Sequence, residues 1–289
     1  MSPSRNRRLR QLIQNGIVQM PGAFNALTAR SIEKTGFDAL YVSGAGLSNA
    51  VYGLPDVGMI TMSEAVAHAH NIAAAVSIPV IVDGDTGFGE AMNTARTVRE
   101  MEASGVSGIH FEDQILPKRC GHLDGKELVS AEAMAEKLRA AAAARTDPDF
   151  LIIARTDARG VIGFDDAVDR AKRYLDSGAD AIFPEAMQNR DELARFAERV
   201  NAPLLANMTE FGKTPLLSLA ELRDMGYRMV IYPQTALRVA FKAITTMLMD
   251  LRRDGDQNGW IDRMQTRAEL YELLDYDGLT KVDAAATKK

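Results

Sequence analysis

The 289-residue sequence predicts an α/β protein, a (β/α)8 TIM-type barrel that forms one domain over residues 1–289. Eight short apolar runs alternate with longer helical segments along most of the chain, the order expected of strands and covering helices. The runs are continuous rather than alternating with polar residues, which is typical of parallel strands buried on both faces. An open dinucleotide-binding sheet is disfavoured, because residues 20–24 carry no glycine fingerprint after the first strand.

The elements can be read in order along the chain. Strands are predicted at residues 17–20, 39–43, 80–83, 108–112, 150–155, 181–184, 203–207 and 229–232. Between them, Thr61 and Ser218 each precede a glutamate by three residues and so begin two helices with capping boxes. The alanine-rich segment 131–144 favours a third helix. The glycines that mark the turn from a helix into the next strand are Gly36, Gly105, Gly178 and Gly226.

Composition excludes several classes of protein. The net charge is −5, from 34 basic and 39 acidic residues, so there is no electrostatic basis for nucleic-acid binding. The longest apolar runs, such as 150–154, fall far short of the ~18 residues that a membrane span requires. The arginine-rich N-terminus lacks a following apolar segment, which favours a first helix containing Leu9, Leu12 and Ile13 over a secretory signal. Cys120 is the only cysteine, which fits a reducing compartment, and we expect a cytoplasmic protein.

Polar residues gather where the predicted strands end. They are Ser43 to Ala45, Asp83 to Asp85, Glu112 and Asp113, Arg155 to Asp157, Glu185, Asn207 to Thr209, and Gln234 and Thr235. Any one of them could instead cap the following helix. In a barrel, however, all of these ends open at one mouth, where barrel enzymes carry out their chemistry. Their agreement therefore favours an active site.

Asp83 and Asp85 follow the third strand and are separated by a glycine. Such carboxylates can turn toward one cation, and hard oxygen ligands without a cysteine or histidine cluster favour Mg²⁺ or Mn²⁺ over zinc. Glu112, at the end of the next strand, is a natural third carboxylate, directly or through water. The plainer alternative is a capping aspartate followed by a turn aspartate.

The other polar groups of this mouth are suited to a small acid with several negative charges. Arginine forks match carboxylates bidentately, and amides and hydroxyls complete the recognition. The candidate groups are Lys118, Arg119, Arg155, Arg238, Glu185, Asn207 and Thr209. We expect a di- or tricarboxylic acid as the ligand.

Cys120 lies in a polar stretch between two cations, Lys118 and Arg119, and His122. Adjacent positive charge lowers the pKa of a thiol, so the residues favour a functional thiol over an incidental small residue in a basic turn. His122 is expected to form hydrogen bonds within the loop rather than bind a metal.

Several of these segments resemble known motifs in the isocitrate lyase/phosphoenolpyruvate mutase superfamily. They include residues 118–122 (Lys-Arg-Cys-Gly-His), 82–89, 110–114, 154–158 and 207–210, in the order of that family and over nearly the whole chain. The resemblance implies a magnesium-dependent barrel and a homotetramer. It also implies that the C-terminal helical region, about 241–289, is swapped between neighbouring subunits.

The resemblance further implies roles for matching positions. Asp83 and Asp85 would hold Mg²⁺, with Asp56 and Glu112 in its outer coordination sphere. Cys120, as general acid, would sit on a mobile loop, and Tyr41 is the candidate base. The residues implied to bind substrate are Ser43, Gly44, Ala45, Cys120, Gly121, His122, Arg155, Glu185, Asn207, Thr209, Arg238 and Arg267, with Phe183 and Ile231 as an apolar wall beside a methyl group. Ala45 replaces a frequent glycine, and residues 123–126 differ from some members.

The activity that the resemblance implies is retro-aldol cleavage of 2-methylisocitrate to pyruvate and succinate. The alternatives are oxaloacetate hydrolysis and 2,3-dimethylmalate cleavage, which keep the loop cysteine. Isocitrate is disfavoured as the substrate because the insertions of longer isocitrate lyases are missing. Phosphoryl transfer is disfavoured because phosphonopyruvate mutases usually lack the cysteine. A Schiff-base aldolase would need a strand-end lysine, which the predicted strand ends lack. A binding protein without catalysis is disfavoured because the metal, thiol and clamp positions are intact.

Overall fold

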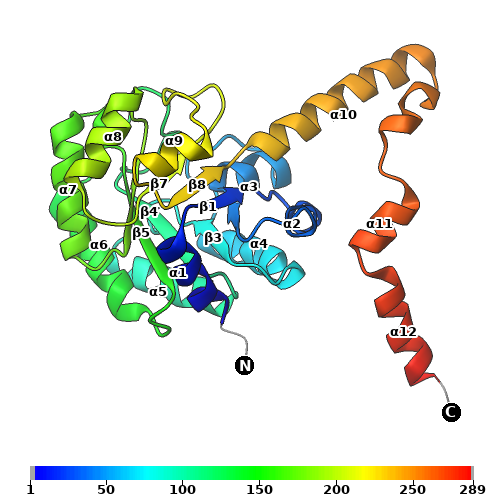
Figure 1. The fold of residues 1–289 in the computed structure, drawn as a ribbon, viewed down its shortest axis with the longest axis horizontal. Coiled ribbons are helices and arrows are strands. Elements are labelled where there is room, and N and C mark those ends of the chain that lie inside the picture. The colour runs from blue at the N-terminus through cyan, green and yellow to red at the C-terminus, as the bar shows by residue number, and fades with distance from the viewer. Residues whose placement is uncertain (1–3, 288–289) are drawn as a thin grey trace.

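The computed structural model describes residues 4–287, and its parallel strands close into a barrel (Figure 1). The strands are β1 (Val18–Pro21), β2 (Leu40–Val42), β3 (Val80–Asp83), β4 (Gly108–Glu112), β5 (Leu151–Thr156), β6 (Ala181–Pro184), β7 (Leu205–Asn207) and β8 (Met229–Tyr232). One sheet has the order β1-β8-β7 and the other the order β2-β3-β4-β5-β6. Parallel bridges between Gly22 and Tyr41 and between Ile182 and Leu204 join the two sheets at both edges. The predicted barrel and all eight predicted strands are therefore confirmed.

Most of the helices surround this barrel, and the C-terminal ones lie apart from it (Figure 1). They are α1 (Arg5–Asn15), α2 (Ala26–Lys34), α3 (Gly44–Val51), α4 (Met62–Ala75), α5 (Ala91–Ala103), α6 (Ala131–Ala144), α7 (Phe164–Asp176), α8 (Arg190–Arg199), α9 (Leu219–Asp224), α10 (Thr235–Asp254), α11 (Arg267–Leu273) and α12 (Tyr276–Ala286), with short 3₁₀ turns at η1 (Ala158–Gly160) and η2 (Asn258–Arg263). The capping boxes of Thr61 and Ser218 are confirmed, and Ser130 caps α6. None of the helices in residues 4–287 is long and apolar enough to cross a membrane.

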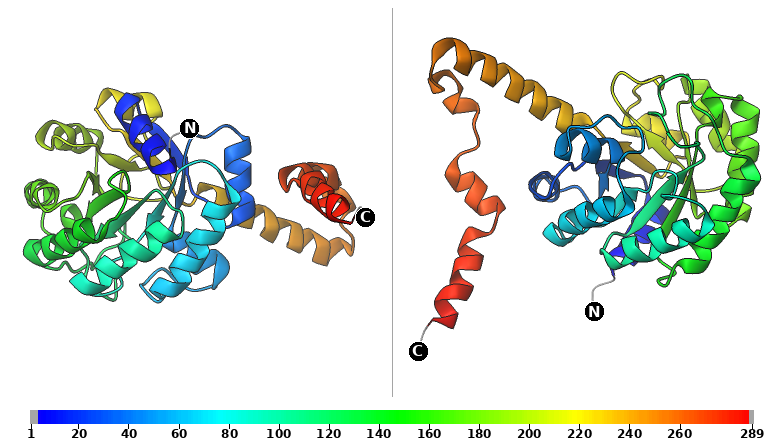
Figure 2. Two further views of the ribbon diagram at one scale, coloured as in Figure 1. Left: turned by 90° about the horizontal axis from the view of Figure 1, so that it is seen from below. Right: turned by 180° about the vertical axis from the view of Figure 1, so that it is seen from behind.

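Two layers of apolar side chains follow from the alternation along each strand. Residues such as Met20, Ile81 and Ile153 point inward and fill the barrel. Their neighbours in sequence point outward and pack against the helices. Leu9 and Ile13 of α1 join the interior layer, so this helix closes the amino-terminal end of the barrel (Figure 2). The opposite end stays open for polar side chains.

The C-terminal segment leaves the barrel as a separate arm. Helix α10 projects outward, and η2, α11 and α12 follow it at a distance from the strands (Figures 1 and 2). Helix α11 touches α2 through the hydrogen bond from Arg30 Nη1 to the Leu273 carbonyl, at 3.3 Å, and the ion pair of Lys34 with Glu272. The predicted helical region is present, although its expected boundary at residue 241 falls inside α10. Residues 288 and 289 of the predicted tail lie outside the described residues.

Candidate active site

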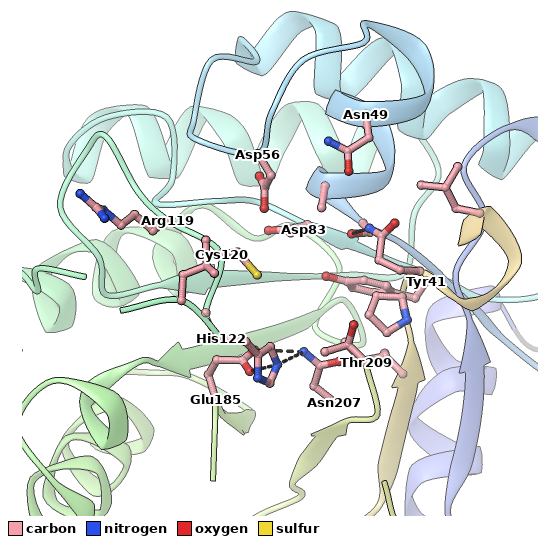
Figure 3. A pocket seen from close by; sticks show the side chains of 18 of the residues that line it. Tyr41, Asn49, Asp56, Asp83, Arg119, Cys120, His122, Glu185, Asn207 and Thr209 are labelled. Carbon is pink, nitrogen blue, oxygen red and sulfur yellow. Dashed lines mark hydrogen bonds and ion pairs between the residues drawn. The ribbon is translucent and has the colours of Figure 1, made fainter. Parts of the chain in front are cut away.

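A cavity of about 590 Å³ opens at the carboxyl ends of the strands, with Cys120 on one side and Tyr41 on the other (Figure 3). The predicted site residues that line it are Tyr41, Ser43, Ala45, Asp56, Asp83, Cys120, Gly121, His122, Arg155, Phe183, Glu185, Asn207, Thr209, Ile231 and Arg238. The remaining predicted residues, Gly44, Asp85, Glu112 and Arg267, are not part of its lining. The barrel thus brings together polar groups from almost every strand end.

The two aspartates after β3 share a buried position beside the cavity. The Asp83 carboxylate accepts hydrogen bonds from the backbone N–H groups of Gly44, at 3.1 Å, and Asp85, at 3.0 Å. Asp85 has a left-handed backbone with φ of 45°. Its Oδ1 lies 2.8 Å from Lys118 Nζ, and the same ammonium pairs with Asp56. Lys118, expected as a substrate clamp, therefore pairs with these carboxylates.

Burial and neighbouring charges set the ionisation of this pair. Burial raises the pKa of Asp85 to about 6, since Asp83 adds to the effect and Lys118 offsets only part of it. Burial also disfavours ionised Asp83, but His110, Lys118 and Arg155 outweigh it and lower the pKa of Asp83 to about 2. Burial lowers the pKa of His110 itself to about 4, so its ring is neutral near pH 7. We therefore assign the low pKa of Asp83 to Lys118 and Arg155.

The carboxylates fit a divalent cation. Glu112 Oε1 is buried with no hydrogen-bond partner, and burial raises the pKa of Glu112 well above its ordinary value. The cluster thus holds more buried acceptors than donors, which is a costly arrangement unless a cation joins it. Within residues 4–287, no three histidine, cysteine or acidic side chains are placed so that they alone could hold a metal ion, so water and substrate would have to supply further ligands. Asp83 and Asp85 would hold Mg²⁺ together with water and substrate oxygens, as Mg²⁺ prefers, with Asp56 and Glu112 further out.

Tyr41 forms a buried pair with His110, a residue that is not among the site residues predicted from the sequence. Tyr41 Oη lies 2.7 Å from His110 Nε2, and the two rings are stacked. Burial, reinforced by Asp83, raises the pKa of Tyr41 well above its ordinary value. The phenol is therefore protonated near pH 7, which favours it as a hydrogen-bond donor. Its expected role as the base stays a prediction.

Arg155 is held rigidly between carboxylates. Its Nη1 lies 2.9 Å from Glu112 Oε2, and its Nε donates to Asp157 Oδ2 at 2.9 Å. Glu185 Oε2 lies 3.6 Å from Nε, and the guanidinium stacks over the Phe183 ring. These ionic partners outweigh burial and raise the pKa of Arg155 well above its ordinary value. Arg155 therefore presents a permanent, oriented positive charge to the cavity.

The Cys120 thiol points into the cavity (Figure 3). The expectation that flanking cations lower its pKa is wrong: burial of the sulfur raises the pKa of Cys120 above its ordinary value, and Glu185 adds to the rise. The cations are engaged elsewhere, because Lys118 pairs with carboxylates and the Arg119 side chain donates to the Asp124 carbonyl. The thiol is consequently protonated near pH 7, the state that a general acid requires.

His122 anchors the Cys120 loop, as expected of a loop hydrogen-bonder. The backbone N–H of Lys213 donates to His122 Nδ1 at 3.0 Å, so the other nitrogen, Nε2, carries the proton. That nitrogen lies 2.8 Å from Glu185 Oε1. Asn207 Nδ2 donates to Glu185 Oε2 at 3.2 Å (Figure 3). Burial opposes ionisation of Glu185, but Arg155 and His122 outweigh it and lower its pKa well below the usual range.

The remaining predicted residues lie around the rim or away from it. Ser43 caps α3, and its Oγ also accepts from Gln234 Nε2 at 3.2 Å. Arg238 pairs with Glu210 at 2.7 Å and is partly exposed. Arg267 begins α11 on the arm, so this chain does not bring it to its own cavity.

These features describe a cavity at the mouth of a (β/α)8 barrel, lined by buried carboxylates, an oriented arginine and a thiol, at the end of the barrel where enzymes of this architecture carry out their chemistry. The family model described as phosphoenolpyruvate phosphomutase matches residues 9–252. A protein of Corynebacterium glutamicum named probable 2-methylisocitrate lyase 1 is 52% identical, over 92% of this chain and 88% of its own. The 2-methylisocitrate lyase of Aeropyrum pernix is 49% identical, over 97% of this chain and 91% of its own.

Solved structures of the same fold are also similar to this chain over nearly its whole length. The crystal structure of 2,3-dimethylmalate lyase, a PEP mutase/isocitrate lyase superfamily member, has a TM-score of 0.93 and 37% identity, covering 99% of this chain and 97% of its own. Phosphonopyruvate hydrolase in complex with oxalate and Mg²⁺ has a TM-score of 0.89 and 33% identity, covering 99% of this chain and all of its own. The chain belongs to the PEP mutase/isocitrate lyase superfamily. Within it, the chain is a carbon–carbon lyase.

Proposed function

We propose that the chain cleaves 2-methylisocitrate to pyruvate and succinate by magnesium-assisted retro-aldol chemistry. The observation that carries this proposal is the Cys120 thiol, which points into the cavity that Asp83 and Arg155 also line. Cleavage leaves a carbanion beside a carboxylate, and a protonated thiol in that position can quench it. The similarity to relatives named for this substrate supports the same choice.

The reaction breaks the bond between the alcohol carbon and the neighbouring carbon that carries a carboxylate. The alcohol gives its proton to a base of the site and its carbon becomes the ketone of pyruvate. The electron pair of the broken bond moves to the second carbon, which becomes part of succinate, and the proton that Cys120 gives to this carbon is later replaced by the one that the base has taken. Mg²⁺ or Mn²⁺, held by Asp83 and Asp85, would supply Lewis-acid stabilisation to the alcohol oxygen and its adjacent carboxylate. Arg155 stabilises the charge that grows on the succinate fragment. Cys120 then donates its proton to the carbon.

The apolar wall supports the methylated substrate over isocitrate. Phe183 and Ile231 are each only 1% exposed and line the same cavity as the charged groups. A methyl group placed against them leaves water, which is favourable by about 0.8 kcal/mol. The carboxylates of the substrate would meet Ser43, Asn207 and Arg238.

We further propose that the active form is a cytoplasmic homotetramer whose C-terminal arms cross to neighbouring subunits. The arm exposes apolar side chains that a monomer would leave in water, a pattern typical of an interface. They are Val239, Phe241, Ile244, Leu248, Met249, Ile261, Met264, Leu279 and Val282. Arg267 would reach a partner's cavity by this route.

A substrate panel tests the function. With Mg²⁺ present, the purified chain is expected to release pyruvate from 2-methylisocitrate much faster than it releases pyruvate from 2,3-dimethylmalate or glyoxylate from isocitrate, and to release little oxalate from oxaloacetate. Turnover of one of the other acids without pyruvate release from 2-methylisocitrate would reject the proposed substrate within the family. The Cys120→Ser variant controls for contaminating activity.

A further inference from the structure

Lys126 lies at the end of the Cys120 loop and is buried under it. Its side chain is 1% exposed, and it does not belong to the cavity lining. The ammonium donates one hydrogen bond to the Gly121 carbonyl, next to Cys120. A second hydrogen bond runs from Nζ to Asp157 Oδ1 at 2.8 Å. Lys126 thus joins the tip of the loop to the end of β5.

Asp157 is the fixed end of this connection. Its side chain is fully buried, and its carboxylate also accepts from Arg155 Nε at 2.9 Å and Nη2 at 3.2 Å. Its backbone N–H donates to Asp113 Oδ1 at 2.9 Å. One carboxylate therefore orients both the Arg155 guanidinium and, through Lys126, the loop that carries Cys120.

The space around the loop matches this contact. Gly121 packs directly on Arg155 and Glu185, so that a Cβ there would overlap both side chains. At Gly160, a Cβ would lie 3.2 Å from Lys126 Nζ, and its absence leaves room for the ammonium. Because both positions are glycine, the loop can pack closely against the cavity residues and against Lys126.

We propose that Lys126 is a positioning residue that holds the Cys120 loop in its closed, cavity-facing position. When the loop lifts, the Gly121 carbonyl moves away and the buried ammonium loses one of its two acceptors. A buried charge that lacks hydrogen-bond acceptors is unfavourable. Closing the loop therefore lowers the free energy, because it restores the second acceptor of the Lys126 ammonium. This inference rests on the proposed function only for its effect on turnover, because the loop position can be measured without substrate.

Amide hydrogen exchange of the metal-free, substrate-free full chain tests the proposal. In Lys126→Met, exchange within residues 117–126 is expected to rise by about 10- to 100-fold, the effect of losing one charge-assisted hydrogen bond. Amides of the barrel strands should keep their wild-type rates. Lys172→Met, at an exposed lysine of α7, is the matched control and should leave the loop unchanged. Unchanged exchange in the Lys126→Met loop would overturn the proposal.

Steady-state kinetics provide the second arm. Lys126→Met is expected to lower kcat by about 10- to 100-fold while KM changes by less than about 3-fold, since the variant displaces the thiol and leaves the groups that hold the substrate in place. An unchanged kcat would likewise overturn the role. If no panel substrate is turned over by the wild type, the substrate proposal fails while the exchange result still decides the role of Lys126.

Gly160→Ala is a second variant that tests the same contact if Lys126→Met does not fold. The added methyl crowds Lys126 Nζ without removing a polar group or touching the cavity. We expect a smaller rise of loop exchange, about 2- to 5-fold, in a protein that melts near the wild-type temperature. No rise in this variant would count against the proposal.

Discussion

His122 Nε2 lies 2.8 Å from Glu185 Oε1, and this contact joins the Cys120 loop to the end of β6. The two residues are 63 positions apart in the chain. Glu185 is held in turn by Asn207 and lies beside Arg155. The loop that delivers the thiol and the arginine that faces the substrate therefore share one buried carboxylate.

His122→Asn should weaken the contact between the Cys120 loop and Glu185. The variant loses the hydrogen bond from Nε2 to an ionised acceptor, and we expect kcat to fall by about 10- to 100-fold. The measurement is pyruvate release at saturating substrate. His70→Asn, at an exposed histidine of α4, controls for the substitution itself. Equal activity of the two variants would contradict a role of the His122–Glu185 contact in turnover.

Cys120→Ser should remove the general acid. A hydroxyl is a much weaker acid than a thiol, so turnover is expected to fall by about 10²- to 10⁴-fold. Circular dichroism and the melting temperature should match the wild type, because the side chain faces the cavity and does not belong to the apolar core. Near-normal turnover in a folded variant would exclude Cys120 as the proton donor.

The pKa of Cys120 can be followed by alkylation, because it is the only cysteine of the chain. Burial raises this pKa, so the thiolate appears only at higher pH than in a free thiol. The rate of iodoacetamide modification against pH should have its midpoint above that of the same chain unfolded in guanidinium. A midpoint below that of the unfolded chain would mean that the neighbouring cations dominate after all.

Asp85→Asn should stabilise the metal-free protein. Burial raises the pKa of Asp85 from 3.8 to about 6, which corresponds to roughly 3 kcal/mol of destabilisation near pH 7. A raised carboxyl pKa means that stability is present at low pH and is lost as pH rises from about 4 to about 6. We expect the variant to melt about 2–6 °C higher at neutral pH, with the difference shrinking at about pH 4.

Mg²⁺ supplies the control for this prediction. Added Mg²⁺ should raise the melting temperature of the wild type, since it binds the folded state, and should raise that of Asp85→Asn much less. Removal of the metal by a chelator should abolish pyruvate release, and Mg²⁺ or Mn²⁺ should restore it. A lower melting temperature for the metal-free variant would show that Asp85 is stabilising as an anion.

The arm can be tested by mixing variants. If the arm carries Arg267 into a partner's cavity, Arg267→Ala removes the arginine from the cavity of a neighbouring subunit. Cys120→Ser instead removes the thiol from the cavity of its own chain. Oligomers that contain both chains then include cavities with an intact thiol and an intact arginine. We expect co-expressed mixtures to recover a measurable part of the wild-type activity, above the sum of the separate variants. Mixed oligomers that form without recovery would reject the crossing of the arm.

Much of the fold follows from local patterns. Continuous apolar runs predict buried parallel strands, and the polar residue after each run predicts the composition of the open mouth. This pattern predicts Asp83, Arg155 and Asn207, because each lies within one residue of the carboxyl end of its strand. The inward alternation of β4 also places His110 toward the interior, between Gly108 and Glu112, so this signal was present in the sequence.

The contacts that control charge depend on the tertiary structure. The sequence places Lys118 two residues from Cys120, but folding turns its ammonium to Asp56 and Asp85 and leaves the thiol buried beside Glu185. The bridge from Lys126 to Asp157 likewise spans 31 positions. By itself the sequence determined the barrel, the mouth and the kinds of group in it, because these follow from local hydrophobic periodicity. Only the tertiary structure decided which charges meet, because burial and pairing depend on residues far apart in the chain.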